Sequence, residues 1–101
     1  MVFGKLLRQL RLTSGLGIKR LAPELGVNYT YLSKLENNQI SPSAQLVSRV
    51  AEYFGYDRNQ LLLSAGKVPA EILEILRENP DDAIELLRKH FGRARAQQSS
   101  R

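Results

Sequence analysis

The chain has 101 residues, enough for one domain with its own core and a short appendage. It has no cysteine, which excludes disulfides, a thiolate nucleophile and sulfur-ligated metals. The net charge of +5 fits an anionic partner, and the lack of a long apolar run or a signal-like start predicts a cytosolic protein.

The first predicted helix covers residues 3–13. Gly15 lies just past its end, where a helix commonly stops. Its apolar side chains recur at helical spacing: Phe3, Leu6, Leu7 and Leu10.

A short helix and a sharp turn are predicted next, over residues 18–26. Gly26 stands where the helix of residues 18–25 must end and where a left-handed backbone is wanted. Pro23 lies beyond the first turn and removes one backbone hydrogen bond, so we expect this helix to be short or bent. Its inward face holds Leu21, Ala22 and Leu25.

Residues 28–37 are predicted to form a second short helix, with Asn28 as its N-cap. Leu32 and Leu35 would face inward and a polar edge outward. Two short helices around a glycine corner have the spacing of a helix-turn-helix, in which residues 28–37 would be the recognition helix.

The loop that follows is polar. Asn37 or Asn38 can adopt the left-handed backbone that often ends a helix. Ser41 and Pro42 are predicted to be the N-cap and first helical position of a helix over residues 43–54.

A fifth helix is predicted before Gly66. Asp57 and Gln60 have the spacing of a capping box at its start. The apolar run of residues 61–63 would close the core.

Residues 67–92 are predicted to form a helical hairpin, broken at Asn79 and Pro80. Two short helices with apolar residues on adjacent faces cannot bury them alone, so we expect a dimerisation or partner-binding element. The alternative is that both helices pack on the first and fifth helices of their own chain. The apolar candidates are Ile72, Leu73, Ile75, Leu76, Ile84, Leu87 and Phe91. Residues 93–101 are predicted to be a disordered basic tail.

The positive charge is concentrated at the two ends of the chain. Residues 1–36 have a balance of +4, residues 37–66 of zero, residues 67–92 of −2, and the tail of +3. This asymmetry fits DNA binding by the front half of the chain.

Residues 3–64 resemble the lambda-repressor-like, or XRE, family of helix-turn-helix proteins. The matching segments come in the family's order: RQLR, GLGIKRLA, ELGVNYTYLSKLEN and SPSAQLVSRVAEYFGYDRNQLL. The resemblance implies an all-α fold: a five-helix DNA-binding domain over residues 1–66, with the two-helix extension of residues 67–92 as an addition.

The resemblance also implies that the recognition helix enters the major groove, with its first exposed residues on base edges. Lys34 can donate to guanine, and Thr30 can place its methyl group beside thymine. The alternative is that the tyrosines pack against neighbours and Lys34 is merely solvated. The base-reading candidates are Asn28, Tyr29, Thr30, Ser33 and Lys34.

Phosphate contacts are expected at two places. The backbone N–H groups of Ile18 and Lys19 begin a helix, where the dipole favours an anion. The resemblance adds Asn37, Asn38 and Ser43, and Tyr31 would contact a phosphate or pack. Many family members have a glutamine in the place of Ile18. Ile18 cannot brace a base-reading side chain, so the register would depend on Lys19 and Asn37.

Arg11 and Glu36 occupy the places of an arginine–glutamate pair in similar proteins. A bidentate pair would join the first helix to the recognition helix. The alternative is two unrelated surface charges.

An enzyme is not expected, because the chain has neither a glycine-rich phosphate loop nor a metal-ligand cluster, and His90 is its only histidine. We expect no cofactor and no metal. The expected function is a sequence-specific regulator of transcription that binds double-stranded DNA, as a homodimeric repressor. The alternative is a protein-interaction module or antitoxin, whose C-terminal helices bind a toxin or antirepressor.

Overall fold

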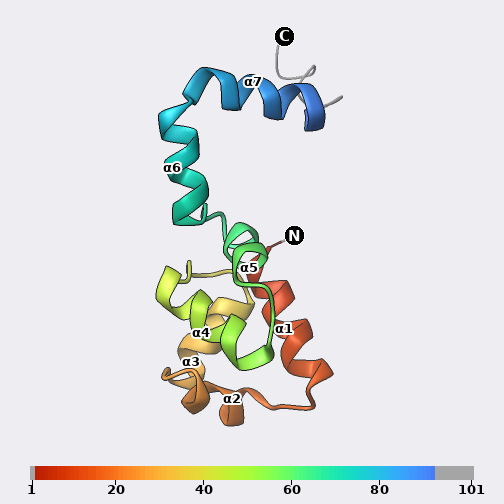
Figure 1. The fold of residues 1–101 in the computed structure, drawn as a ribbon. Coiled ribbons are helices and arrows are strands. Elements are labelled where there is room, and N and C mark those ends of the chain that lie inside the picture. The colour runs from red at the N-terminus through yellow and green to blue at the C-terminus, as the bar shows by residue number, and fades with distance from the viewer. Residues whose placement is uncertain (1, 93–101) are drawn as a thin grey trace. The chain divides into compact units, whose positions relative to one another are not determined.

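The computed structural model describes residues 2–92, which contain seven α-helices and no strand (Figure 1). The all-α fold is therefore confirmed. The helices are α1 (Phe3–Thr13), α2 (Ile18–Glu24), α3 (Tyr29–Glu36), α4 (Ala44–Phe54), α5 (Arg58–Ser64), α6 (Ala70–Glu78) and α7 (Pro80–Phe91).

These helices form two compact units, which divide between Val68 and Pro69. The first unit contains α1–α5 and the second contains α6 and α7. This division lies two residues after Gly66, at which the sequence predicted the first domain to end. The predicted tail of residues 93–101 lies outside the described residues.

The first unit has a core to which each of its five helices contributes. The helical spacing read from the sequence explains it, since apolar residues three and four apart share the inner face of each helix. Its fully buried side chains, at 0–1% exposure, are Leu7, Leu21, Leu25, Leu32, Leu35, Val47, Val50 and Leu61.

The turn between α2 and α3 is built around Gly26, whose φ of +74° is costly for a residue with a side chain. The Val27 N–H donates to the Ala22 carbonyl at 3.0 Å, and Arg49 of α4 donates through Nη1 to the Leu25 carbonyl at 2.9 Å. Pro23 lies inside α2, which has only seven residues and is short, as expected.

The loop between α3 and α4 corrects one expectation. Asn38 has the predicted left-handed backbone, with φ +60°. Ser41 and Pro42, however, are not the N-cap and first residue of α4. Ser43 is the N-cap, and its Oγ accepts from the Leu46 N–H at 3.1 Å. The Pro42 ring is buried in the irregular segment before the helix, so α4 begins later than the serine–proline pattern suggested.

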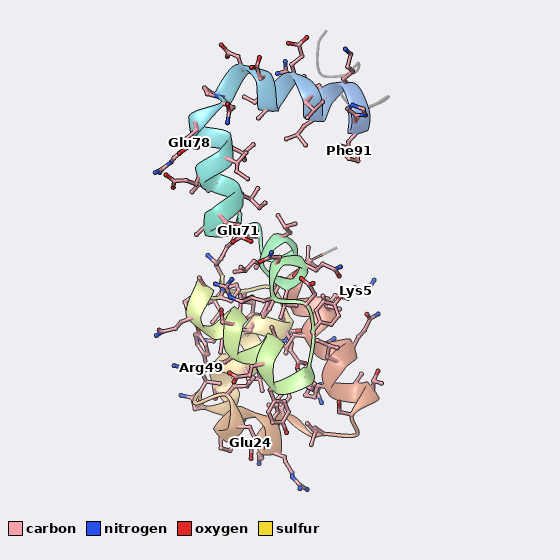
Figure 2. All side chains as sticks on the ribbon, in the orientation of Figure 1. Lys5, Glu24, Arg49, Glu71, Glu78 and Phe91 are labelled. Atoms are coloured by element: carbon pink, nitrogen blue, oxygen red, sulfur yellow. The ribbon has the colours of Figure 1, made fainter. Side chains whose placement is uncertain are left out.

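The second unit is a pair of helices with little buried surface. Asn79 links them and donates through its side-chain amide to the Ile75 carbonyl at 3.1 Å, and Pro80 begins α7. No residue of either helix is buried, and their side chains project on all sides in Figure 2. The exposed apolar residues are Ile72, Leu73, Ile75, Ile84, Leu86, Leu87 and Phe91, while Leu76 is half-buried.

Across residues 2–92, every helix is too short or too polar to cross a lipid bilayer.

Candidate nucleic-acid interface

The outer face of α3 gathers the base-reading candidates. Leu32 and Leu35 anchor the helix in the core, which turns the opposite side outward. The side chains of Tyr29, Thr30 and Lys34 are exposed, and Ser33 between them is half-buried. Asn28 is exposed just before the helix. Polar groups from about two turns thus share one accessible surface.

Asn28 also has a structural role as the N-cap of α3. Its Oδ1 accepts from the Tyr31 N–H at 2.8 Å, which satisfies one of the free donors of the first turn. The NH2 end of this amide remains available to a ligand, because the cap uses only the oxygen.

A contact between α2 and α3 that the sequence reasoning missed joins Lys19 to Tyr29. The Lys19 Nζ lies 5.2 Å from the centre of the Tyr29 ring, a cation–π geometry. Ile18, in contrast, is half-buried and packs against the core. Lys19, and not Ile18, therefore contacts a base-reading candidate, and helical periodicity alone does not signal such a pair.

The predicted pair between Arg11 and Glu36 forms, and it is bidentate. Nε donates to Oε2 at 2.7 Å, and Nη2 donates to Oε1 at 2.9 Å. The Glu36 side chain is 0% exposed and that of Arg11 is 11% exposed, so they are not unrelated surface charges. The hydrogen bonds that Arg11 donates to Glu36 raise the pKa of Arg11, which keeps the guanidinium charged.

Arg11 also joins the pair to the loop after α1, because its Nη1 donates to the Leu16 carbonyl at 2.9 Å. The carboxylate of Glu36 therefore links α3 to α1, and Arg11 extends this link to the loop that precedes α2.

Arg8 is a second arginine on the same carboxylate, and the sequence reasoning missed it. Its Nε donates to Oε1 of Glu36 at 3.3 Å, and its Nη2 donates to Oδ1 of Asn37 at 2.8 Å. The available signal was its position three residues before Arg11, which puts both on one face of α1.

The phosphate-binding candidates are only partly brought together. Asn37 and Asn38 are adjacent and exposed at the end of α3. Ser43 is exposed, but its oxygen caps α4. Tyr31 is half-buried and packs against the core, which matches the packing alternative stated for it.

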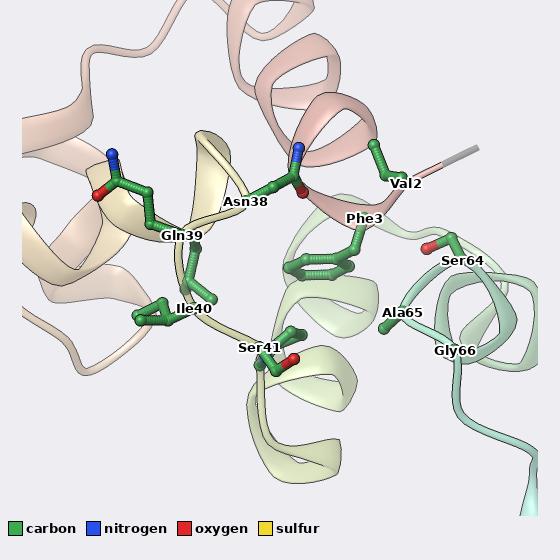
Figure 3. Close-up of a pocket in the computed structure, with 11 residues that line it drawn as sticks. Val2, Phe3, Asn38, Gln39, Ile40, Ser41, Ser64, Ala65 and Gly66 are labelled. Atoms are coloured by element: carbon green, nitrogen blue, oxygen red, sulfur yellow. The ribbon is translucent and has the colours of Figure 1, made fainter.

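Asn38 reaches toward the start of α1, as Figure 3 shows. Its Oδ1 accepts from the Gly4 N–H at 3.2 Å. Gly4 permits this approach, because a β-carbon there would lie 2.6 Å from Asn38 Oδ1 and would also collide with the carbonyl oxygens of Leu35 and Glu36.

An open groove of about 450 Å³ lies beside this contact, within the first unit (Figure 3). The residues that line it are apolar or uncharged polar residues, and one of them is Asn38. Its lining residues are Val2, Phe3, Leu35, Asn38, Gln39, Ile40, Ser41, Pro42, Ser64, Ala65 and Gly66. Elsewhere in residues 2–92, no three His, Asp or Glu side chains group as metal ligands would.

Comparison with known proteins gives a consistent result. Residues 4–67 match the helix-turn-helix domain family. The propionyl-CoA carboxylase regulator of Cereibacter sphaeroides is 37% identical over 76 residues, which are 74% of this chain but 16% of that protein.

Two solved structures share the fold. The clp gene regulator ClgR from Corynebacterium glutamicum has a TM-score of 0.56 and 24% identity, over 90% of this chain and 92% of its own. The complex of the SinR and SinI proteins has a TM-score of 0.56 and 22% identity, over 97% of this chain and 99% of its own.

Proposed function

We propose, because this chain belongs to the lambda-repressor-like (XRE) family of helix-turn-helix proteins, that it binds double-stranded DNA sequence-specifically and regulates transcription. The observation that carries the proposal is the outer face of α3. Its polar side chains are accessible, while a buried ion pair holds its inner side on α1. A helix fixed in this way can present a defined row of side chains to a major groove.

Each exposed side chain suits a base contact of its own. Lys34 can donate to guanine O6 or N7, and Thr30 can hydrogen-bond or contact the thymine methyl group. Tyr29, steadied by Lys19, offers a hydroxyl group. Asn28 and Ser33 complete the base-reading set. A good contact of this kind discriminates between bases by about 1–3 kcal/mol.

Contacts with backbone phosphates, from the start of α2 and from the end of α3, would hold the protein in register on the duplex. The N–H groups of Ile18 and Lys19 begin α2, and the Lys19 ammonium lies over the ring of Tyr29. At the other end of α3, the amides of Asn37 and Asn38 are exposed, and the Ser43 hydroxyl retains its proton for donation. These groups would position the protein without reading the sequence.

Selection of preferred duplexes from a random pool tests the proposal, followed by fluorescence anisotropy with the selected site and a scrambled one. Thr30→Ala and Lys34→Ala should each weaken binding to the selected site by about 5- to 100-fold. Gln9→Ala, exposed on α1, is the control and should leave binding unchanged. Unchanged binding of both α3 variants would show that these side chains do not read bases.

A homodimeric repressor is the specific form we propose. The apolar side chains of α6 and α7 remain exposed in the chain as described. α7 begins with acidic residues and ends with basic ones, so two antiparallel copies about a twofold axis would pair opposite charges. Such a dimer would bind a palindrome with half-sites roughly 34 Å apart, and occupancy of that site would repress overlapping transcription.

A second candidate function is a protein-interaction module or antitoxin. The exposed apolar surface of α6 and α7 favours it, and the SinR structure contains a second protein, SinI. In this case α6 and α7 would bind a toxin or an antirepressor. A pure interaction module would then yield no preferred sequence from the random pool, whereas an antitoxin would bind both DNA and its partner. In either case, substitutions in α7 would abolish binding of the partner.

A further inference from the structure

The side-chain amides of Asn37 and Asn38 are both turned with their oxygens toward α1. Oδ1 of Asn37 accepts from Arg8 Nη2 at 2.8 Å, and Oδ1 of Asn38 accepts from the Gly4 N–H at 3.2 Å. A guanidinium and a backbone N–H can only donate. Neither amide can therefore be reversed without placing a donor against a donor.

The NH2 ends of these amides are consequently left to face other partners. Both residues are exposed, so the donors are accessible. A phosphodiester oxygen can only accept a hydrogen bond, which makes two adjacent NH2 groups complementary to the DNA backbone. A reversed amide would instead present an oxygen to a phosphate and repel it.

We propose that Arg8 is a positioning residue for DNA binding, because it turns the Asn37 amide so that its NH2 group faces a backbone phosphate. The inference rests on the proposed function. The Gly4 N–H orients the Asn38 amide in the same way. Helix α1 thus orients both phosphate donors at the end of α3 without contacting DNA itself.

The surroundings of Arg8 favour this role over a direct phosphate contact. Its guanidinium is held by Glu36 on one side and by Asn37 on the other. The Glu36 carboxylate is fully buried and cannot follow a guanidinium that swings outward. Its Nε and Nη2 are thus engaged within the protein, and any direct contact with a phosphate would be limited to the remaining N–H groups of a guanidinium held in place.

The test measures affinity for the selected duplex in the full chain by fluorescence anisotropy. Asn37→Ala should lose one hydrogen bond and weaken binding about fivefold. Arg8→Met should weaken it by a similar factor, and the double variant by no more than either alone, because both changes remove the same contact. Lys5→Met removes the same charge from an exposed position on α1 and should cost less than about twofold.

Two further readouts separate positioning from charge or folding. Asn37→Asp keeps an acceptor for Arg8 but turns a carboxylate oxygen toward DNA. Binding should therefore weaken about tenfold or more, while the melting temperature should stay the same. The slope of log affinity against log salt should be the same for Arg8→Met and wild type, whereas loss of a direct phosphate contact would reduce it by about 0.9. By NMR, the Asn37 side-chain NH2 signals should shift on DNA addition in wild type but not in Arg8→Met.

The proposal is overturned if Arg8→Met weakens DNA binding no more than Lys5→Met does. It is also overturned if the double variant loses the product of the two single losses in affinity, or if Arg8→Met reduces the slope of log affinity against log salt. It is equally overturned if Asn37→Ala binds like wild type. Failure of the wild-type chain to select any duplex would instead count against the proposed function, and the two failures are therefore distinguishable.

Discussion

The Glu36 carboxylate shows how single residues fix the orientation of α3. A buried carboxylate is expensive unless it is paired and hydrogen-bonded. Here both oxygens accept from Arg11, and one also accepts from Arg8. Within residues 2–92, no buried side-chain N or O atom lacks a hydrogen-bond partner. The charge cluster is complete, so rotation of α3 against α1 would break several bonds at once.

Arg11→Met should destabilise the fold by about 3 kcal/mol, because it leaves a buried carboxylate with only the longer contact to Arg8. Urea denaturation followed by circular dichroism measures the change. Arg11→Met combined with Glu36→Leu should recover part of the loss, since no buried charge then remains unpaired. A loss below about 1 kcal/mol in the single variant would mean that the pair contributes little.

Gly4→Ala should destabilise the fold by about 1–3 kcal/mol, although alanine normally favours a helix. Its β-carbon would meet the backbone oxygens of Leu35 and Glu36, which cannot yield as a side-chain tip would. Gly17→Ala is the comparison, because a β-carbon there meets nothing within 4 Å. Thermal unfolding of both variants should show a clearly lower midpoint for Gly4→Ala only.

At the scale of helices, capping residues explain why several helix starts and ends could be predicted from the sequence. Asn28 and Asp57 accept from the N–H three residues ahead, and Asn38 takes the left-handed turn. These signals are local, because each cap and its partner lie within one helical turn. The predicted start of α4 was wrong because serines flank Pro42 on both sides, and the sequence does not show which of the two accepts from the first turn.

Ser43→Ala should cost about 1 kcal/mol of stability, because it removes the cap on the Leu46 N–H. Ser41→Ala, two residues earlier, is the matched control and should change stability by less than about 0.5 kcal/mol. Equal losses in urea denaturation would mean that the hydrogen bond to Ser43 does not support α4.

The candidate site was less predictable than the helices. The outward positions of α3 follow from periodicity, and Arg11 and Glu36 follow from resemblance. The contacts of Arg8 with Asn37, and of Lys19 with Tyr29, depend on how helices pack. Their partners lie 29 and 10 positions apart in the chain, and no period of a single helix relates them.

For the whole molecule, the two units differ in how they bury apolar surface. The first encloses its own core, whereas α6 and α7 contain no buried residue. Exposed apolar side chains at helical spacing generally mark an interaction surface. The second unit is thus the part of the chain in which association should be sought.

Leu87→Asp should convert the protein from dimer to monomer, because it places a charge in the exposed apolar surface of α7. Light scattering should give twice the 11.4 kDa chain mass for wild type and the single mass for the variant. Leu63→Asp, on the exposed side of α5, is the control and should stay dimeric. A dimer that survives Leu87→Asp would exclude this part of α7 from the interface.

Fastening α3 from its inner side has a consequence for protein engineering. Thr30 and Lys34 are exposed and lie outside the core, whereas Leu32, Leu35 and Glu36 hold the inner side of the helix. Under the proposed function, a combinatorial library at those two positions could be screened for new DNA-sequence preferences without redesign of the scaffold, as long as the arginine–glutamate cluster is left intact.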